Sequence, residues 1–204
     1  MAPYAIVVAI YVRLPSAGWL LWAALTTPAN LVAIAVLGYV VHRNGSSFRN
    51  YMALRWPRAR AIVIGIVCQL ALSLAVSAYT LLRTLSVRGT APNIEVIEAA
   101  PFAEIMPWLW LLATVLVKPI GEEIVFRGFM YRGLATRWEP VLAILTISLI
   151  FAVAHFDNAM FWHFVCGYLY GVLRWRTDSI WAPLAAHITN NLLVVVFRDF
   201  IRIG

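Results

Sequence analysis

Several ionisable and amide side chains lie inside long apolar segments in the second half of this chain. Ionisable groups in such surroundings are costly, so they usually pair with one another and usually mark a functional site. A carboxylate, imidazoles and an amide that converge would suit hydrolysis, which needs a base for water and hydrogen-bond donors for a developing oxyanion. The polar residues within apolar segments are Lys118, Glu122, Glu123, Arg127, His155, His163, His187, Asn190 and Asn191.

The spacing of the acidic residues predicts an ion pair on one helix face. Glu123 and Arg127 are four residues apart, and residues at this spacing are neighbours on a helix surface. Glu122 projects about 100° away from Glu123 on a helix. We therefore expect Glu122 to be the free carboxylate that faces the interior of a helix bundle.

Two further pairs repeat the four-residue spacing. Phe151 and His155 would place an aromatic ring beside an imidazole, and His187 and Asn191 would project an imidazole and an amide in one direction. These residues come from three apolar segments, so a bundle could bring them together.

A turn between two of these segments predicts that Glu122 and His155 lie at one depth. Trp138, Glu139 and Pro140 mark the turn, with Pro140 at the first position of the following helix. Glu122 precedes the centre of the turn by as many residues as His155 follows it. Because antiparallel helices rise equally per residue, both side chains should lie about 25 Å from the turn.

The composition favours a membrane protein. The chain has 204 residues, of which 63% are hydrophobic and 12% are charged, whereas about a quarter of a soluble domain is charged. We expect an all-α fold, a polytopic transmembrane helix bundle of about six spans. The last four helices would form the catalytic core. The predicted helices lie near 18–42, 60–83, 107–136, 140–156, 159–173 and 179–197.

The charge distribution indicates how the chain is organised in its membrane. The net charge is +7, but the arginines flank apolar segments and form no single patch, which argues against nucleic acid as a partner. The arginine-rich turns should be cytoplasmic. We divide the chain into N-terminal transmembrane helices with a polar loop at 1–104, and a core that carries the polar residues at 105–204. The polar connection at about 84–104 suits an exposed loop.

Three motifs together resemble a known family. They are Glu122-Glu123-x-x-x-Arg127, Phe151-x-x-x-His155 and His187-x-x-x-Asn191, and they look like the motifs of the CPBP (Abi) intramembrane proteases. That family includes the type II CAAX prenyl endopeptidases. The resemblance covers about residues 105–200 and preserves the order of the motifs.

The resemblance implies hydrolysis of a peptide bond within or beside the membrane. In the version we favour, which needs no cofactor, Glu122 is the general base and His155 holds the attacking water. His187 and Asn191 would donate hydrogen bonds to the oxyanion. Glu123 and Arg127 would support Glu122, with Phe151 beside His155.

A zinc-dependent version of the same protease is the alternative. His155, His187 and Glu122 would then bind the metal and leave one position open for water. The remaining polar groups receive simpler interpretations. His163 should lie at the interface, Lys118 should have no catalytic role, and Asn190 should bond between helices.

The expected partners are the lipid bilayer and a membrane-anchored peptide or protein substrate. We expect a multi-pass protein of the plasma (inner) membrane, with an active site open to the extracytoplasmic side because the site lies far from the arginine-rich turns. This depth argues against a prenylated substrate and favours a membrane-anchored or exported precursor. A non-enzymatic membrane scaffold or transporter is the rival class of protein.

Overall fold

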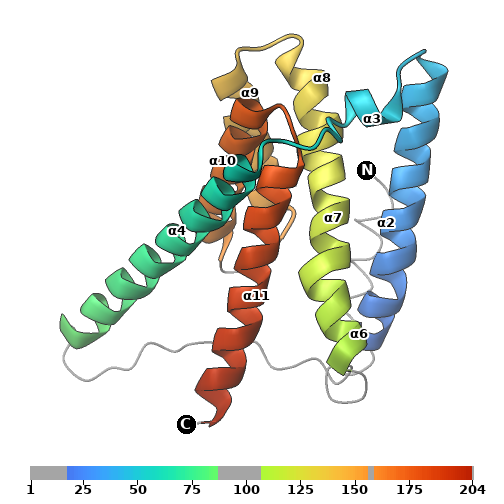
Figure 1. Ribbon diagram of the computed structural model, residues 1–204. Coiled ribbons are helices and arrows are strands. Elements are labelled where there is room, and N and C mark those ends of the chain that lie inside the picture. The colour runs from blue at the N-terminus through green and yellow to red at the C-terminus, as the bar shows by residue number, and fades with distance from the viewer. Residues whose placement is uncertain (1–17, 87–106, 156–158, 204) are drawn as a thin grey trace.

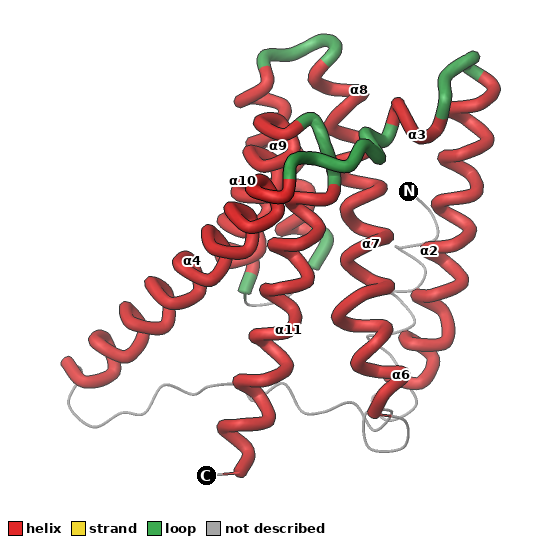
Figure 2. Tube along the Cα trace, viewed as in Figure 1, coloured by secondary structure: helices red, strands yellow, loops and turns green. Residues whose placement is uncertain are grey.

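The computed structural model describes residues 18–86, 107–155 and 159–203, and every regular element within these ranges is a helix (Figures 1 and 2). The all-α prediction is therefore confirmed. Nearly all of the polar connection predicted at 84–104 lies outside the described residues. The elements are α2 (Gly18–Arg43), α3 (Phe48–Tyr51), α4 (Ala59–Ser86), α6 (Pro107–Leu112), η1 (Ala113–Val117), α7 (Lys118–Glu123), η2 (Ile124–Met130), α8 (Tyr131–Ala135), α9 (Pro140–Val153), α10 (Met160–Thr177) and α11 (Trp181–Ile203).

The outer surface of the bundle is apolar. In the described part of the chain one helix, at Ala59–Tyr79, is both long and apolar enough to cross a membrane. Shorter apolar helices cover Asn30–Arg43, Pro140–Val153 and Trp181–Val196. Large apolar side chains are exposed along α4 and α9, including Leu74 and Leu149. Extended exposed apolar surface of this kind is typical of contact with lipid. About six spans were predicted, and one helix among the described residues is both long and apolar enough to be a span.

The helix at 107–135 changes its winding twice. The α-helical α7 lies between two π-helical segments, η1 and η2. The proline at position 119 explains the first change, because proline has no N–H and its ring clashes with the carbonyl four residues earlier. The chain widens instead, and the Lys118 N–H donates to Ala113 O, five residues back. Single π turns of this kind are frequent at functional sites.

Glycines set the closest approaches between helices. A Cβ atom on Gly171 of α10 would lie 2.6 Å from Ile144 of α9, and one on Gly65 of α4 would lie 2.7 Å from the backbone of Ala182 in α11. Gly167 of α10 also packs closely, since a Cβ atom there would lie 3.2 Å from Phe151 and 3.3 Å from the backbone of Ser148, both in α9. These contacts bring α4, α10 and α11 against the helices that carry the polar motifs.

Candidate active site

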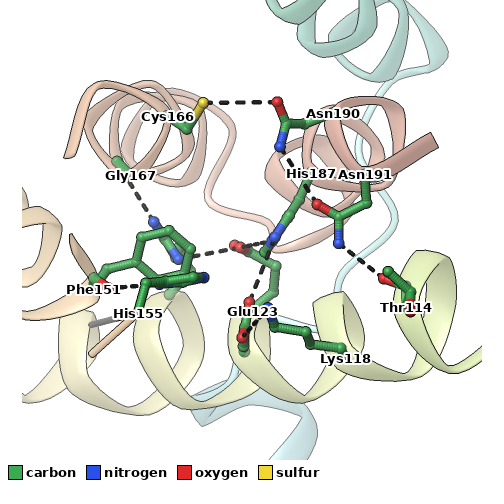
Figure 3. Close-up of polar contacts among 12 residues, drawn as sticks. Thr114, Lys118, Glu123, Phe151, His155, Cys166, Gly167, His187, Asn190 and Asn191 are labelled. Atoms are coloured by element: carbon green, nitrogen blue, oxygen red, sulfur yellow. Dashed lines mark hydrogen bonds and ion pairs between the residues drawn. The ribbon is translucent and has the colours of Figure 1, made fainter. Parts of the chain in front are cut away.

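The two adjacent glutamates lie on α7, and each contacts His187 of the last helix. Figure 3 shows Glu123 and His187 pointing toward one another. Glu123 is fully buried, and its Oε1 lies 3.2 Å from Nη1 of Arg127. This confirms the ion pair predicted from the four-residue spacing. The same Oε1 lies 2.9 Å from Nδ1 of His187. Because a carboxylate paired with arginine accepts hydrogen bonds, Nδ1 of His187 carries a proton and donates it.

Glu122 is less isolated than the helical phase predicted. Its Oε2 lies 3.5 Å from Nε2 of His187, and its Oε1 lies 3.7 Å from Nζ of Lys118. The two glutamates therefore contact the two nitrogens of one imidazole. Among the described residues, Oε2 of Glu122 is buried with no hydrogen-bond partner. A buried acceptor without a partner is costly, and here it is available to water or to a substrate.

His155 lies in the turn directly after α9, one residue beyond the Ala154 cap. Its Nδ1 lies 2.8 Å from the Phe151 carbonyl oxygen. A carbonyl only accepts, so Nδ1 donates and Nε2 keeps the lone pair in a neutral ring. The Phe151 ring lies against both His155 and His187, and Nε2 of His187 lies 3.5 Å from Oε2 of Glu122. The convergence predicted from the turn at 138–140 is therefore seen in the structure.

An aromatic cluster packs between and around the two imidazoles. The ring centroid of Phe151 lies 4.6 Å from that of His155 and 5.8 Å from that of His187. Tyr170 of α10 stacks on His187 at 4.8 Å. His163 stacks on His155 at 3.8 Å. These contacts restrict the rotation of both imidazoles, as a preorganised site requires.

Arg127 of η2 contacts both α9 and α10. Its side chain is 1% exposed, its Nη2 donates to the Gly167 carbonyl at 3.1 Å, and its Cζ lies 4.4 Å from the Phe151 ring centroid. Arg174, also buried, donates from Nε to the Arg127 carbonyl at 3.1 Å. A return from five-residue to four-residue spacing after η2 leaves one carbonyl without a backbone donor. Arg174 satisfies the Arg127 carbonyl.

Asn191 is held by the backbone of η1. Its Nδ2 donates to the Thr114 carbonyl at 2.8 Å. Five-residue spacing would pair this carbonyl with residue 119, but that residue is proline and has no N–H. Asn191 therefore supplies the missing donor. One of its two amide hydrogens is used in this way, and the other remains for a further acceptor.

The structure thus brings the predicted site residues together from α7, η2, α9 with the turn after it, and α11. Two further residues join them: Lys118 contacts Glu122, and His163 contacts His155. Sequence reasoning assigned no catalytic role to Lys118, which lies close to Glu122. It expected His163 at the membrane interface, and the structure shows in addition that His163 stacks on His155. The i, i+4 spacing of Lys118 and Glu122 was the available signal for the first contact. No local spacing indicated that His155 and His163 stack, because the two imidazoles come from different segments of the chain.

The described residues contain no group of three or more histidine, cysteine, aspartate or glutamate side chains arranged to hold a metal ion. The proposed zinc set of His155, His187 and Glu122 differs from such an arrangement in a specific way. Both nitrogens of His187 already face carboxylates, and Nδ1 of His155 bonds a carbonyl. In these positions the side chains do not form a closed set of metal ligands.

Comparison with known proteins supports the resemblance found in the motifs. Residues 104–193 match the family described as Type II CAAX prenyl endopeptidase Rce1-like. The predicted resemblance is therefore confirmed over this part of the chain, which contains all three motifs.

Two curated proteins are similar to the chain. "Putative membrane peptidase YdiL" of Bacillus subtilis is 31% identical over 111 residues, which are 54% of this chain and 43% of that protein. "Uncharacterized 24.3 kDa protein" of Escherichia coli is 30% identical over 95 residues, 44% of each chain. The chain spans less than half the length of these relatives. No solved structure gives a significant match.

Proposed function

Because residues 104–193 match a family of membrane proteases, we propose that this chain is an intramembrane endopeptidase that uses Glu122 to activate water. The observation that carries the proposal is the buried Oε2 of Glu122. It has no hydrogen-bond partner among the described residues, and it lies 3.5 Å from Nε2 of His187. A carboxylate oxygen in such a place suits a general base.

The proposed reaction adds water across a peptide bond. Glu122 takes a proton from water, which His155 orients through Nε2, and the resulting hydroxide attacks the scissile carbonyl carbon. The carbonyl oxygen becomes an oxyanion. When the tetrahedral intermediate collapses, the C–N bond breaks and Glu122 returns its proton to the leaving amine.

Two groups would stabilise the oxyanion. Nδ1 of His187 donates to Glu123, so its Nε2 donates to a substrate only when the ring is protonated. Asn191 has one amide hydrogen that Thr114 does not use. Preorganised donors of this kind are typically worth about 10²–10³ in rate each.

A zinc-dependent version of the same hydrolysis would draw on His155, His187 and Glu122. Zinc would supply a metal-bound water as the nucleophile. The zinc-dependent version requires His187 to turn away from Glu122 or Glu123, since its two nitrogens face these carboxylates. We therefore favour the version in which glutamate activates water directly.

The proposed substrate is a membrane-anchored or exported precursor that is cut on the extracytoplasmic side of the plasma membrane. The two glutamates lie at the end of α7, near the middle of the helical segment 107–135 and away from the arginine-rich turns near residues 44–58 and 136–139 (Figure 1). With those turns cytoplasmic, the site opens toward the opposite face. Labelling of a single cysteine placed at position 139 checks this orientation: reaction with an impermeant reagent from outside the cell would contradict it.

The test is to compare wild-type protein with Glu122→Gln in the native host. Glutamine keeps the volume and polarity of the side chain but removes the base. We expect mass spectrometry of membrane-protein termini to show one or more intact precursors that accumulate with Glu122→Gln. Glu139→Gln, an exposed glutamate at the turn, is the matched control and should leave the termini unchanged. Identical termini in all three strains, at equal protein abundance, would favour a scaffold or transporter.

A further inference from the structure

A chain of three side-chain amides connects the N-terminal half of the protein to the candidate site. Nε2 of Gln69 in α4 donates to Oδ1 of Asn190 at 3.0 Å. Nδ2 of Asn190 donates to Oδ1 of Asn191 at 3.4 Å, and Nδ2 of Asn191 donates to the Thr114 carbonyl at 2.8 Å. Figure 3 shows the last two of these bonds beside His187. Gln69 and Asn190 are 121 residues apart in sequence.

Gln69 is an unusual residue for its position. It lies on the helix whose length and apolarity suit a membrane span, and most side chains in that segment face outward. Gln69 itself is fully buried, and its Oε1 has no partner among the described residues. An amide inside a span is costly, so it is retained where it serves packing or function. The close approach of α4 to Ala182 at Gly65 directs Gln69 toward α11.

The direction of the hydrogen bonds along the chain is fixed at its end. The Thr114 carbonyl only accepts, and proline at position 119 removes the backbone donor that would otherwise reach it. Asn191 must therefore turn its NH₂ group to Thr114 and its oxygen to Asn190. Asn190 in turn must present its NH₂ group to Asn191 and its oxygen to a donor. Gln69 is that donor.

We infer that Gln69 is a positioning residue of the site, which holds Asn191 in one orientation through Asn190. This inference rests on the proposed role of Asn191 as an oxyanion donor. Without Gln69, the Asn190 oxygen loses its 3.0 Å donor and keeps only the 3.9 Å contact with the Cys166 thiol, so the Asn190 amide is less restrained. Asn191 is then held mainly by its bond to the Thr114 carbonyl, and its second amide hydrogen is no longer fixed in one direction. The N-terminal half of the chain, outside the family match at 104–193, thereby contributes to catalysis.

The experiment is a double-mutant cycle with Gln69→Met and Asn191→Ala. The substrate is a precursor that accumulates with Glu122→Gln, and the readouts are kcat and KM in purified full-length protein. We expect Gln69→Met to lower kcat about tenfold, a part of the 10²–10³ that one preorganised donor supplies, with KM nearly unchanged. In the Asn191→Ala background the same change should alter kcat less than twofold. Cys68→Ala, at the adjacent half-buried position, should leave kcat and KM unchanged.

A structural role for Gln69 alone predicts a different result. Equal losses of kcat in both backgrounds, or no loss in either, would overturn the positioning role. The midpoint of unfolding in detergent, measured for the same four proteins, provides a readout that does not need activity. We expect the two single-variant shifts to be non-additive, because linked residues couple. Coupled midpoints without any Glu122-dependent cleavage would overturn the proposed function alone, whereas additive midpoints would overturn the connection between Gln69 and Asn191.

Discussion

The imidazole of His187 bonds the carboxylate of Glu123, with Nδ1 2.9 Å from Oε1. This contact joins the last helix to the helix that carries both glutamates, across 64 residues of sequence. Glu123 also pairs with Arg127, whereas its neighbour Glu122, the proposed base, keeps a buried Oε2 without a hydrogen-bond partner among the described residues. Two adjacent residues of one type thus receive different roles from their surroundings.

Glu123→Gln should destabilise the protein and reduce its activity. The change leaves the buried guanidinium of Arg127 without its carboxylate, and breaking a buried ion pair costs about 3–5 kcal/mol. Unfolding in a detergent titration measures the loss, with Glu139→Gln as the exposed control. Equal midpoints for the two variants would show that the pair does not hold the helix.

Lys118→Met should lower kcat about tenfold, the effect of about 1.4 kcal/mol, because the ammonium lies 3.7 Å from the Glu122 carboxylate. Methionine keeps the apolar stem of the side chain, so we expect the midpoint of unfolding to change little. Lys118→Arg keeps the charge and should retain most of the activity. If both variants lose activity equally, the charge of Lys118 is not what matters.

Arg174→Met should weaken the end of the second π segment. The substitution leaves the buried Arg127 carbonyl without its side-chain donor, and an unsatisfied buried group costs about 1–3 kcal/mol. Arg176→Met, an exposed arginine on the same helix, is the comparison. Hydrogen exchange at residues 127–132 should increase in the first variant only.

Gly171→Ala should destabilise the contact between α9 and α10. A Cβ atom there would lie 2.6 Å from Ile144, and overpacking of this kind costs about 1–3 kcal/mol. Gly133→Ala is the matched helical control, since its Cβ atom would meet only the Tyr51 hydroxyl, at 4.0 Å. It should be neutral or slightly stabilising. A lower midpoint for Gly133→Ala than for Gly171→Ala would contradict the packing described here.

Metal removal separates the two versions of the mechanism. We expect a chelator such as 1,10-phenanthroline to change the rate of cleavage by less than twofold, because Glu122 activates water directly in the proposed mechanism. A known zinc peptidase treated in the same buffer is the control for chelation. Loss of cleavage that zinc restores, with stoichiometric metal in the purified protein, would instead establish the zinc-dependent version.

Local features of the site could be predicted from the sequence. The apolar segments predicted six helices, and the structure has helices in all six positions. The ion pair of Glu123 with Arg127 and the contact of Phe151 with His155 followed from four-residue spacing. Such spacing is fixed by the geometry of one helix, so no knowledge of the tertiary structure is needed.

The remaining contacts depend on how the helices are placed against one another. Helical phase predicted a free Glu122, but the structure brings both glutamates to His187. The π segments on either side of α7 change the phase that regular α-helical spacing assumes.

The sequence by itself determined the helices, the family resemblance and the pairs within each helix, because short-range geometry sets them. Tertiary structure alone decided that His187 lies between two carboxylates and that Gln69 reaches Asn190. Distances between helices depend on their rotation and close approach, which packing at glycines such as Gly65 and Gly171 sets. Those degrees of freedom leave no local pattern in the sequence.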